Sequence, residues 1–128
     1  MCPFATNPAR RTSLKVALKK QQIHVVECDE ATKGFVVIEH SFFGHAFVSL
    51  IAVVPTSRRQ GYALALLAKS EQVCSSGKLF TSTNVSNIAA QKLFLQAGFV
   101  ASGHIDNLDV GDTELVYFKS VDSALPHS

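Results

Sequence analysis

The chain has 128 residues, of which 47% are hydrophobic and 17% charged, and this composition predicts one globular domain over residues 1–128 with loose tails at 1–6 and 121–128. A net charge of +2 is too small to indicate a nucleic-acid partner, and no apolar run reaches the ~20 residues that span a bilayer. The three cysteines are far apart, which excludes a disulfide scaffold or a zinc site and predicts a cytoplasmic protein without a metal.

The N-terminal third of the sequence predicts a helix followed by a β-hairpin. Asn7 and Pro8 are typical of a helix start, and apolar residues continue at helical spacing to about Lys20. The next predicted elements are strands over Ile23–Asp29 and Phe35–Ser41, joined by a turn at Glu30–Gly34.

The middle of the sequence predicts a central strand and a second helix. His45–Val54 is almost entirely apolar, as expected of a strand covered on both faces, and Pro55 ends it because proline lacks an N–H group. Arg58–Gly61 then leads into a helix that ends at Ser75–Gly77.

The C-terminal part predicts a strand, a third helix and a closing hairpin. Their expected bounds are Lys78–Val85, Asn87–Ala97, Phe99–Ile105 and Glu114–Lys119. Hairpins followed by alternating strands and helices predict an α+β fold, with helices on the faces of a mixed sheet.

The segment after the central strand predicts an anion-binding site. Free N–H groups and the positive end of the helix dipole meet at the start of the second helix. Gly61 lets a phosphate approach the backbone, Ala63 keeps the next turn small, and Arg58 and Arg59 add cationic contacts. A glycine that only eases a tight turn explains the same residues, so this segment alone leaves both interpretations open.

Two motifs occur in order in this part of the sequence. The first is Arg58-Arg-Gln-Gly-Tyr-Ala63, preceded by Ile51-Ala-Val-Val-Pro55, and the second is Asn87-Ile-Ala-Ala-Gln-Lys-Leu-Phe-Leu-Gln-Ala-Gly-Phe99. They resemble the acyl-CoA pyrophosphate loop and the second motif of the GNAT superfamily of acetyl-CoA-dependent N-acyltransferases. The resemblance extends from about Phe35 to Lys119 and is specific, because both motifs recur in the family's order.

The resemblance implies a central twisted, mostly antiparallel sheet with flanking helices and a parallel, splayed central strand pair. That pair would be His45–Val54 and Lys78–Val85, with the pantetheine arm of the cofactor between them like an added strand. The family's first strand is missing or displaced here, which leaves Ile23–Asp29 as an edge. We therefore expect a homodimer formed through this edge, or shielding of the edge by residues 1–6.

The resemblance also implies acetyl-CoA or another acyl-CoA as cosubstrate. Ile51 and Val53 would offer backbone groups to the pantetheine arm, and Asn87 would reach the cofactor with its amide. The pyrophosphate would be held by Arg58, Arg59, Gln60, Gly61, Tyr62 and Ala63. Asn87 is also a natural helix cap, and the two roles are compatible.

Phe94 marks a departure from the family pattern. The family often has a tyrosine at this position, which protonates the leaving CoA thiolate, and a phenyl ring cannot donate a proton. The resemblance implies that Phe94 still contacts the cofactor. Cys74 and Ser82 are alternative proton donors, although each is also explained as ordinary filling of a helix or a strand.

The general base has several candidates. His45 shares a strand face with Phe47, the position where some relatives carry a glutamate, and histidine titrates near neutral pH. Glu39 and His40 on the neighbouring strand are rivals. A structural or exposed role explains each of these residues without catalysis, and a water relay is a further alternative.

The segment 106–114 contains four carboxylates in nine residues. It is not a calcium loop, because Leu108 stands where an oxygen ligand is needed. Asp106 and Asp109 are instead candidate substrate contacts in an acidic rim that attracts a cationic amine. A solvated hairpin turn is the alternative.

These features predict an N-acetyltransferase (EC 2.3.1.-) in which a primary amine of a small molecule or peptide attacks the thioester directly in a ternary complex. The alternative is a non-catalytic CoA-binding sensor or accessory subunit, favoured by Phe94 and by the missing first strand. A nucleic-acid-binding module that uses the basic N-terminal helix is a third hypothesis, which the small net charge disfavours.

Overall fold

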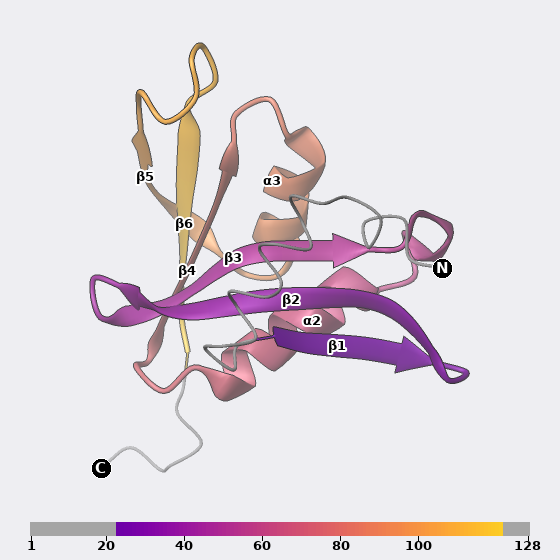
Figure 1. Cartoon of the computed structure of the whole chain (residues 1–128). Coiled ribbons are helices and arrows are strands. Elements are labelled where there is room, and N and C mark those ends of the chain that lie inside the picture. The colour runs from indigo at the N-terminus through magenta and orange to yellow at the C-terminus, as the bar shows by residue number, and fades with distance from the viewer. Residues whose placement is uncertain (1–22, 122–128) are drawn as a thin grey trace.

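The computed structural model describes residues 23–121, so the predicted helix at 7–20 and residues 1–6 lie outside the described residues. Six strands form one sheet in the order β1-β2-β3-β4-β6-β5 (Figure 1). The elements are β1 (Ile23–Cys28), β2 (Ala31–Phe42), β3 (His45–Val53), the 3₁₀ helix η2 (Pro55–Ser57), α2 (Tyr62–Val73), β4 (Lys78–Asn84), α3 (Ile88–Gln96), β5 (Val100–Ile105) and β6 (Glu114–Ser120).

The predicted α+β fold is confirmed: all neighbouring strands are antiparallel except β3 and β4, which are parallel. Val121, expected in the C-terminal tail, packs in the core.

The turn between β1 and β2 lies earlier than predicted. Asp29 and Glu30 form it, with φ angles of 54° and 65°, and β2 already begins at Ala31. Two residues at positive φ give a two-residue turn whose twist matches that of the strands. Gly34, which suggested a turn, lies inside β2, where a Cβ would be 2.5 Å from the carbonyl oxygen of Ala52 on β3. This glycine permits the close approach of two strands.

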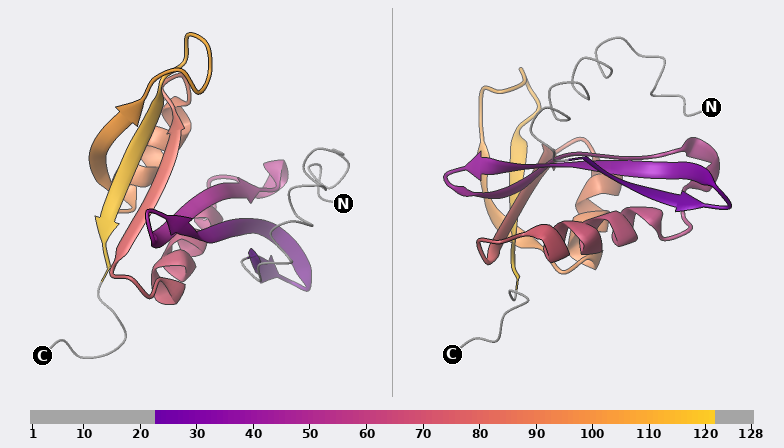
Figure 2. Two further views of the ribbon diagram at one scale, coloured as in Figure 1. Left: turned by 60° about the vertical axis from the view of Figure 1, so that its left-hand side comes forward. Right: turned by 60° about the horizontal axis from the view of Figure 1, so that its bottom comes forward.

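Both described helices pack on one face of the sheet. The right-hand view of Figure 2 shows α2 and α3 on the same side of β1–β3. Leu66, Leu67 and Phe94 from these helices join the main core cluster with alternate residues of the strands. Phe35 and Val37 of β2 belong to a second, smaller cluster on the opposite face. The main core therefore lies between the sheet and the α2–α3 layer.

A β-bulge changes which side chains of β3 point into the core and which point away from it. Ser49 is an extra residue, because Val48 and Leu50 pair with consecutive residues of β2. As a result Ile51 and Val53 pack against the same core cluster as Val48, although strict alternation would place them on the other face.

The parallel pair β3–β4 is joined by a short seam. It pairs at three positions only, from Ala46 opposite Leu79 to Val48 opposite Thr81. Beyond this point the strands diverge, as Figure 1 and the left-hand view of Figure 2 show. The Thr81 hydroxyl donates a hydrogen bond to the Val48 carbonyl at 3.0 Å where they part. The expected cover of β3 on both faces is partial, because only Ala46 and Val48 of its nine residues are buried and Ser49 is exposed.

Candidate active site

The segment between β3 and α2 leaves the start of α2 open. Arg59 and Gly61 have positive φ angles of 65° and 83°, which turn the chain sharply into the helix. No side chain caps α2, and its first turn contains no acidic residue. The N–H groups and the positive dipole end are therefore free to face an anion. A Cβ on Gly61 would meet no atom within 4 Å, so the space beside this residue is open.

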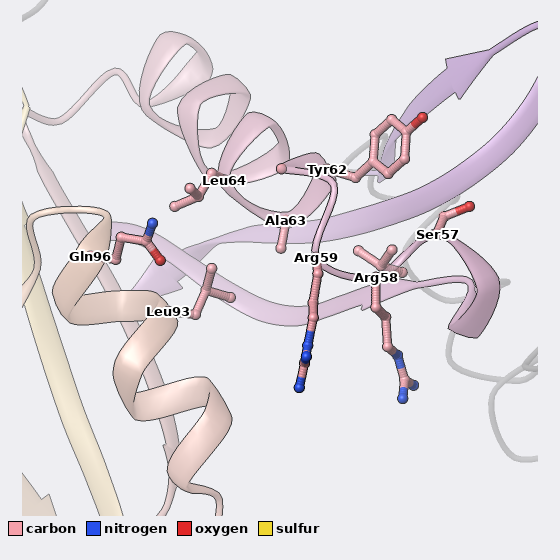
Figure 3. A pocket seen from close by; sticks show the side chains of 10 residues that line it. Ser57, Arg58, Arg59, Tyr62, Ala63, Leu64, Leu93 and Gln96 are labelled. Atoms are coloured by element: carbon pink, nitrogen blue, oxygen red, sulfur yellow. The ribbon is translucent and has the colours of Figure 1, made fainter.

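A cavity of about 320 Å³ lies between this segment, the first turn of α2 and α3 (Figure 3). Five of the six predicted loop residues line it, all except Gln60, and Val53 lines it from the end of β3. The side chains of Arg58 and Arg59 extend from the loop in the same direction (Figure 3). The structure thus brings the cationic loop and the end of the diverging strand to one cavity.

The opposite wall of the cavity is formed by residues that no sequence motif indicates as cavity-lining. Leu93 and Gln96 line it from α3, and Leu64 from α2. Residues three apart on a helix share a face, so the sequence shows that Leu93 and Gln96 point the same way. Which face of α3 meets α2 depends on tertiary packing, and the helical pattern does not contain this information.

Gln60 and Tyr62 differ from the rest of the loop. Gln60 is exposed, and its amide nitrogen donates to the Thr56 carbonyl at 3.5 Å. The Tyr62 side chain points away from the arginines (Figure 3). A hydrogen bond with the Cys28 thiol, then partial burial and the nearby negative charge of Asp29, raise the pKa of Tyr62. Tyr62 therefore lies near the end of β1 as well as beside the cavity.

Besides Gln60, three predicted cofactor contacts do not line the cavity. The Asn87 side chain caps α3, accepting a hydrogen bond from the backbone N–H three residues on at 3.1 Å. Phe94 is 2% exposed, and its ring centroid lies 6.0 Å from that of Phe99 and 5.4 Å from that of Tyr117. Ile51 is partly buried against the core. Contact of these residues with the cofactor stays a prediction.

His45 and Glu39 lie at the closed end of the β3–β4 pair. His45 precedes the paired positions of β3, and its Nδ1 atom is buried without a hydrogen-bond partner among the described residues. Its ring centroid is 6.1 Å from that of Phe80. Glu39 pairs opposite Phe47, on the side of β3 away from β4. The structure does not bring either residue to the cavity, and a catalytic role for them stays a prediction.

Asp106 and Asp109 lie in the exposed loop between β5 and β6. Asp109 accepts a hydrogen bond from the Asn84 amide at 2.8 Å, which ties the loop to the end of β4. Asp106 accepts a hydrogen bond from the Thr113 hydroxyl at 3.4 Å and lies 3.7 Å from Nε2 of His104. Both carboxylates therefore have partners that order the loop, and a contact with substrate stays a prediction.

In residues 23–121 no group of three or more His, Cys, Asp and Glu side chains is placed to hold a metal ion. None of the described helices has the length and apolar character needed to cross a membrane. Cys28 and Cys74 are free thiols.

Comparison with known protein families and solved structures assigns the chain to one family. Residues 3–99 match the Acetyltransferase (GNAT) family. The chain belongs to this family. A crystal structure of a GNAT-family acetyltransferase from Bacillus cereus ATCC 10987 has 38% sequence identity and a TM-score of 0.85, over 90% of this chain and 81% of that one. The resemblance inferred from the two motifs is confirmed, and this GNAT acetyltransferase uses acetyl-CoA as its cosubstrate.

More distant GNAT structures share the fold. A Bacillus anthracis str. Ames protein assigned as a streptothricin acetyltransferase and solved with acetyl-CoA has 21% identity and a TM-score of 0.72, over 78% of this chain and 62% of that one. A Salmonella typhimurium protein solved with its cofactor acetyl-CoA has 16% identity and a TM-score of 0.69, over 94% of this chain and 77% of that one. Comparison with curated proteins gives no match.

Proposed function

We propose that this GNAT acetyltransferase transfers the acetyl group of acetyl-CoA to a primary amine of a small molecule or peptide, which attacks the thioester directly in a ternary complex. One observation carries the proposal. The uncapped start of α2 and the end of the diverging strand β3 line the same cavity. An anion site that continues into a gap between strands suits an elongated ligand with a pyrophosphate and a narrow arm.

The loop and the start of α2 hold the pyrophosphate in this proposal. Backbone N–H groups of Gly61–Ala63 donate to its oxygens, and the guanidinium groups of Arg58 and Arg59 add charge-assisted hydrogen bonds. Ile51 and Val53 offer backbone groups that β4 does not pair, so the arm can bind as an added strand.

The protein contributes orientation and polarity to the transfer. Bound acetyl-CoA supplies the thioester, and the chain holds it beside the amine, which lowers the barrier by proximity. Backbone N–H groups on the free side of β3 polarise the thioester carbonyl. The attacking amine must be neutral, so a proton acceptor is required next to it.

Two further features belong to this proposal. β1 is an edge strand in the described part of the sheet, and pairing of this edge with a second copy gives a homodimer. A cytoplasmic location fits the free thiols of Cys28 and Cys74. The alternative to this enzyme is a CoA-binding subunit without turnover. Phe94 favours it, because a phenyl ring has no hydroxyl that could protonate the leaving thiolate.

The test combines binding and turnover on the full chain. Acetyl-CoA at about 100 times its dissociation constant is expected to stabilise the protein by about 2.7 kcal/mol, measured as a rise in melting temperature. Release of free thiol from acetyl-CoA is then followed with polyamines, aminoglycosides, amino acids and peptide N-termini as acceptors. Stabilisation without thiol release supports the subunit without turnover, and no stabilisation at millimolar acetyl-CoA contradicts the proposal.

A further inference from the structure

A partly buried carboxylate lies beside the point where β3 and β4 diverge. Glu114 begins β6 and pairs opposite Asn84 of β4. Its Oε2 atom accepts a hydrogen bond from the Ser82 hydroxyl at 2.6 Å. Ser82 is the first residue of β4 beyond the three positions that pair with β3. The Glu114 carboxylate is therefore held at the end of the seam, where the gap begins.

This carboxylate lies on the face of the sheet opposite to α2 and α3. Leu79 of β4 belongs to the core beneath the helices, so alternation places Phe80 and Ser82 on the other face. The ring of Phe80 lies 5.3 Å from that of Phe118 on β6 and provides an apolar surface next to Ser82. The cavity that lies between the start of α2 and α3 is on the helix side. The sheet thus has one face with the proposed phosphate site and an opposite face that carries Glu114, and the gap between β3 and β4 lies between them.

Glu114 has no cationic partner among the described residues. The ion pairs of that part of the chain join Lys119 to Glu71 and His104 to Asp106. A partly buried carboxylate is costly when only a neutral hydroxyl faces it. An acceptor amine supplies both the missing positive charge and an N–H donor, and the face that carries Glu114 lies opposite to the side where the pyrophosphate is proposed to bind.

We propose that Glu114 is the catalytic residue that binds the acceptor amine and takes its proton, with Ser82 as the residue that positions the carboxylate. The proposal rests on the proposed function, because it requires acetyl-CoA in the gap. The amine nitrogen forms a bond to the acetyl carbon, and the carbon–sulfur bond breaks with its electron pair on sulfur. Before this attack the bound ammonium gives one proton to the Glu114 carboxylate, and the second proton, which the nitrogen loses as the new bond forms, passes through water to the thiolate.

The test replaces the carboxylate by an amide of the same size. Glu114→Gln keeps an acceptor for the Ser82 hydroxyl and is expected to fold, while kcat/KM for the amine falls by about 10²–10⁴. KM for acetyl-CoA and the stabilisation by acetyl-CoA stay unchanged, because the cosubstrate binds on the other side. The control Glu30→Gln, in the exposed β1–β2 turn, is expected to change kcat/KM by less than about twofold.

Ser82 variants separate positioning from packing. Ser82→Ala is expected to lower kcat with little change in KM for acetyl-CoA, and Ser82→Thr, which keeps the hydroxyl, restores most of the loss. Equal loss in both variants contradicts the positioning role.

Three results overturn the role of Glu114. A Glu114→Gln enzyme with wild-type kcat/KM overturns it and leaves the proposed function intact. A variant that loses acetyl-CoA binding places Glu114 on the cosubstrate side and overturns it as well. Wild-type protein that binds acetyl-CoA but releases no thiol, with the amine panel or with water as the only acceptor, overturns both proposals together.

Discussion

Gly61 combines a left-handed backbone with open space. Its φ is 83°, and an added Cβ would meet no atom within 4 Å. We expect Gly61→Glu to abolish the stabilisation by acetyl-CoA, because it places bulk and negative charge at the anion site. Gly61→Ala is expected to cost about 1 kcal/mol of stability through the unfavourable φ but to keep most of the acetyl-CoA effect. Melting temperatures of both variants with and without acetyl-CoA check this, and a full shift in Gly61→Glu would falsify the assignment of the loop.

The residues of the candidate site differ in how visible they are in the sequence. Arg58, Arg59 and Gly61 were predictable, because a glycine and cations at a strand-to-helix turn form a local pattern. Ser82 and Glu114 are 32 residues apart and meet only through the register of β4 and β6. No local pattern encodes that register, and so the pair emerges only from the structure.

At the scale of elements, β2 and β3 approach closely at Gly34. A Cβ at this position would lie 2.5 Å from the Ala52 carbonyl oxygen, so the strands must move apart in Gly34→Ala. We expect a loss of about 1–3 kcal/mol in the free energy of unfolding, as for an overpacked core. The matched control is Gly44→Ala, which has a φ of 81° but open space and is expected to lose about 1 kcal/mol. Urea unfolding measures the free energy of unfolding of both variants. An equal loss in the two would show that β2 and β3 move apart at Gly34 without an energetic cost.

The contact between β1 and α2 makes stability depend on pH. Burial, and then the charge of Lys69 on α2, lower the pKa of His24 on β1 below its usual 6.5. As the pH falls, His24 therefore takes up a proton in the unfolded chain before it does so in the folded protein. Its contribution to the free energy of unfolding is fully present above about pH 6.5 and is lost as the pH falls through the lowered pKa. We expect the free energy of unfolding to fall between pH 7.5 and 5, and His24→Gln to reduce that fall.

Carboxylates also titrate in the lower part of this pH range and lower the stability of both wild type and His24→Gln. The effect of His24 is therefore the difference between the two proteins in how far the free energy of unfolding falls. Urea unfolding of both proteins at each pH measures this difference. Parallel curves for wild type and His24→Gln would show that β1 does not contribute to the acid sensitivity.

The elements themselves were largely predictable, because helical and strand spacing are local properties. Helices α2 and α3 begin within one residue of the expected glycine and asparagine signals. The β1–β2 turn was misplaced because Gly34 serves a contact between strands. The bulge at Ser49 was also hidden, since an extra residue in β3 appears only when its partner strand is known.

At the scale of the whole molecule, β1 forms one edge of the described sheet, and Val25 on it is 52% exposed. We expect a homodimer in which this edge pairs with a second copy. Light scattering at micromolar concentration measures the mass. Val25→Lys, which adds a charge to the edge, is expected to give a monomer, and a wild-type monomer contradicts pairing through β1.

The short seam also leaves the sheet with two edges in its interior. Three residue pairs join its halves, and beyond them Ile51–Val53 and Ser82–Asn84 each pair with an outer neighbour but not with each other. Exposed strand edges are where chains add to one another and aggregate. In the proposed binding mode acetyl-CoA occupies this gap and covers both edges, so we expect the protein to aggregate more slowly with acetyl-CoA than without it.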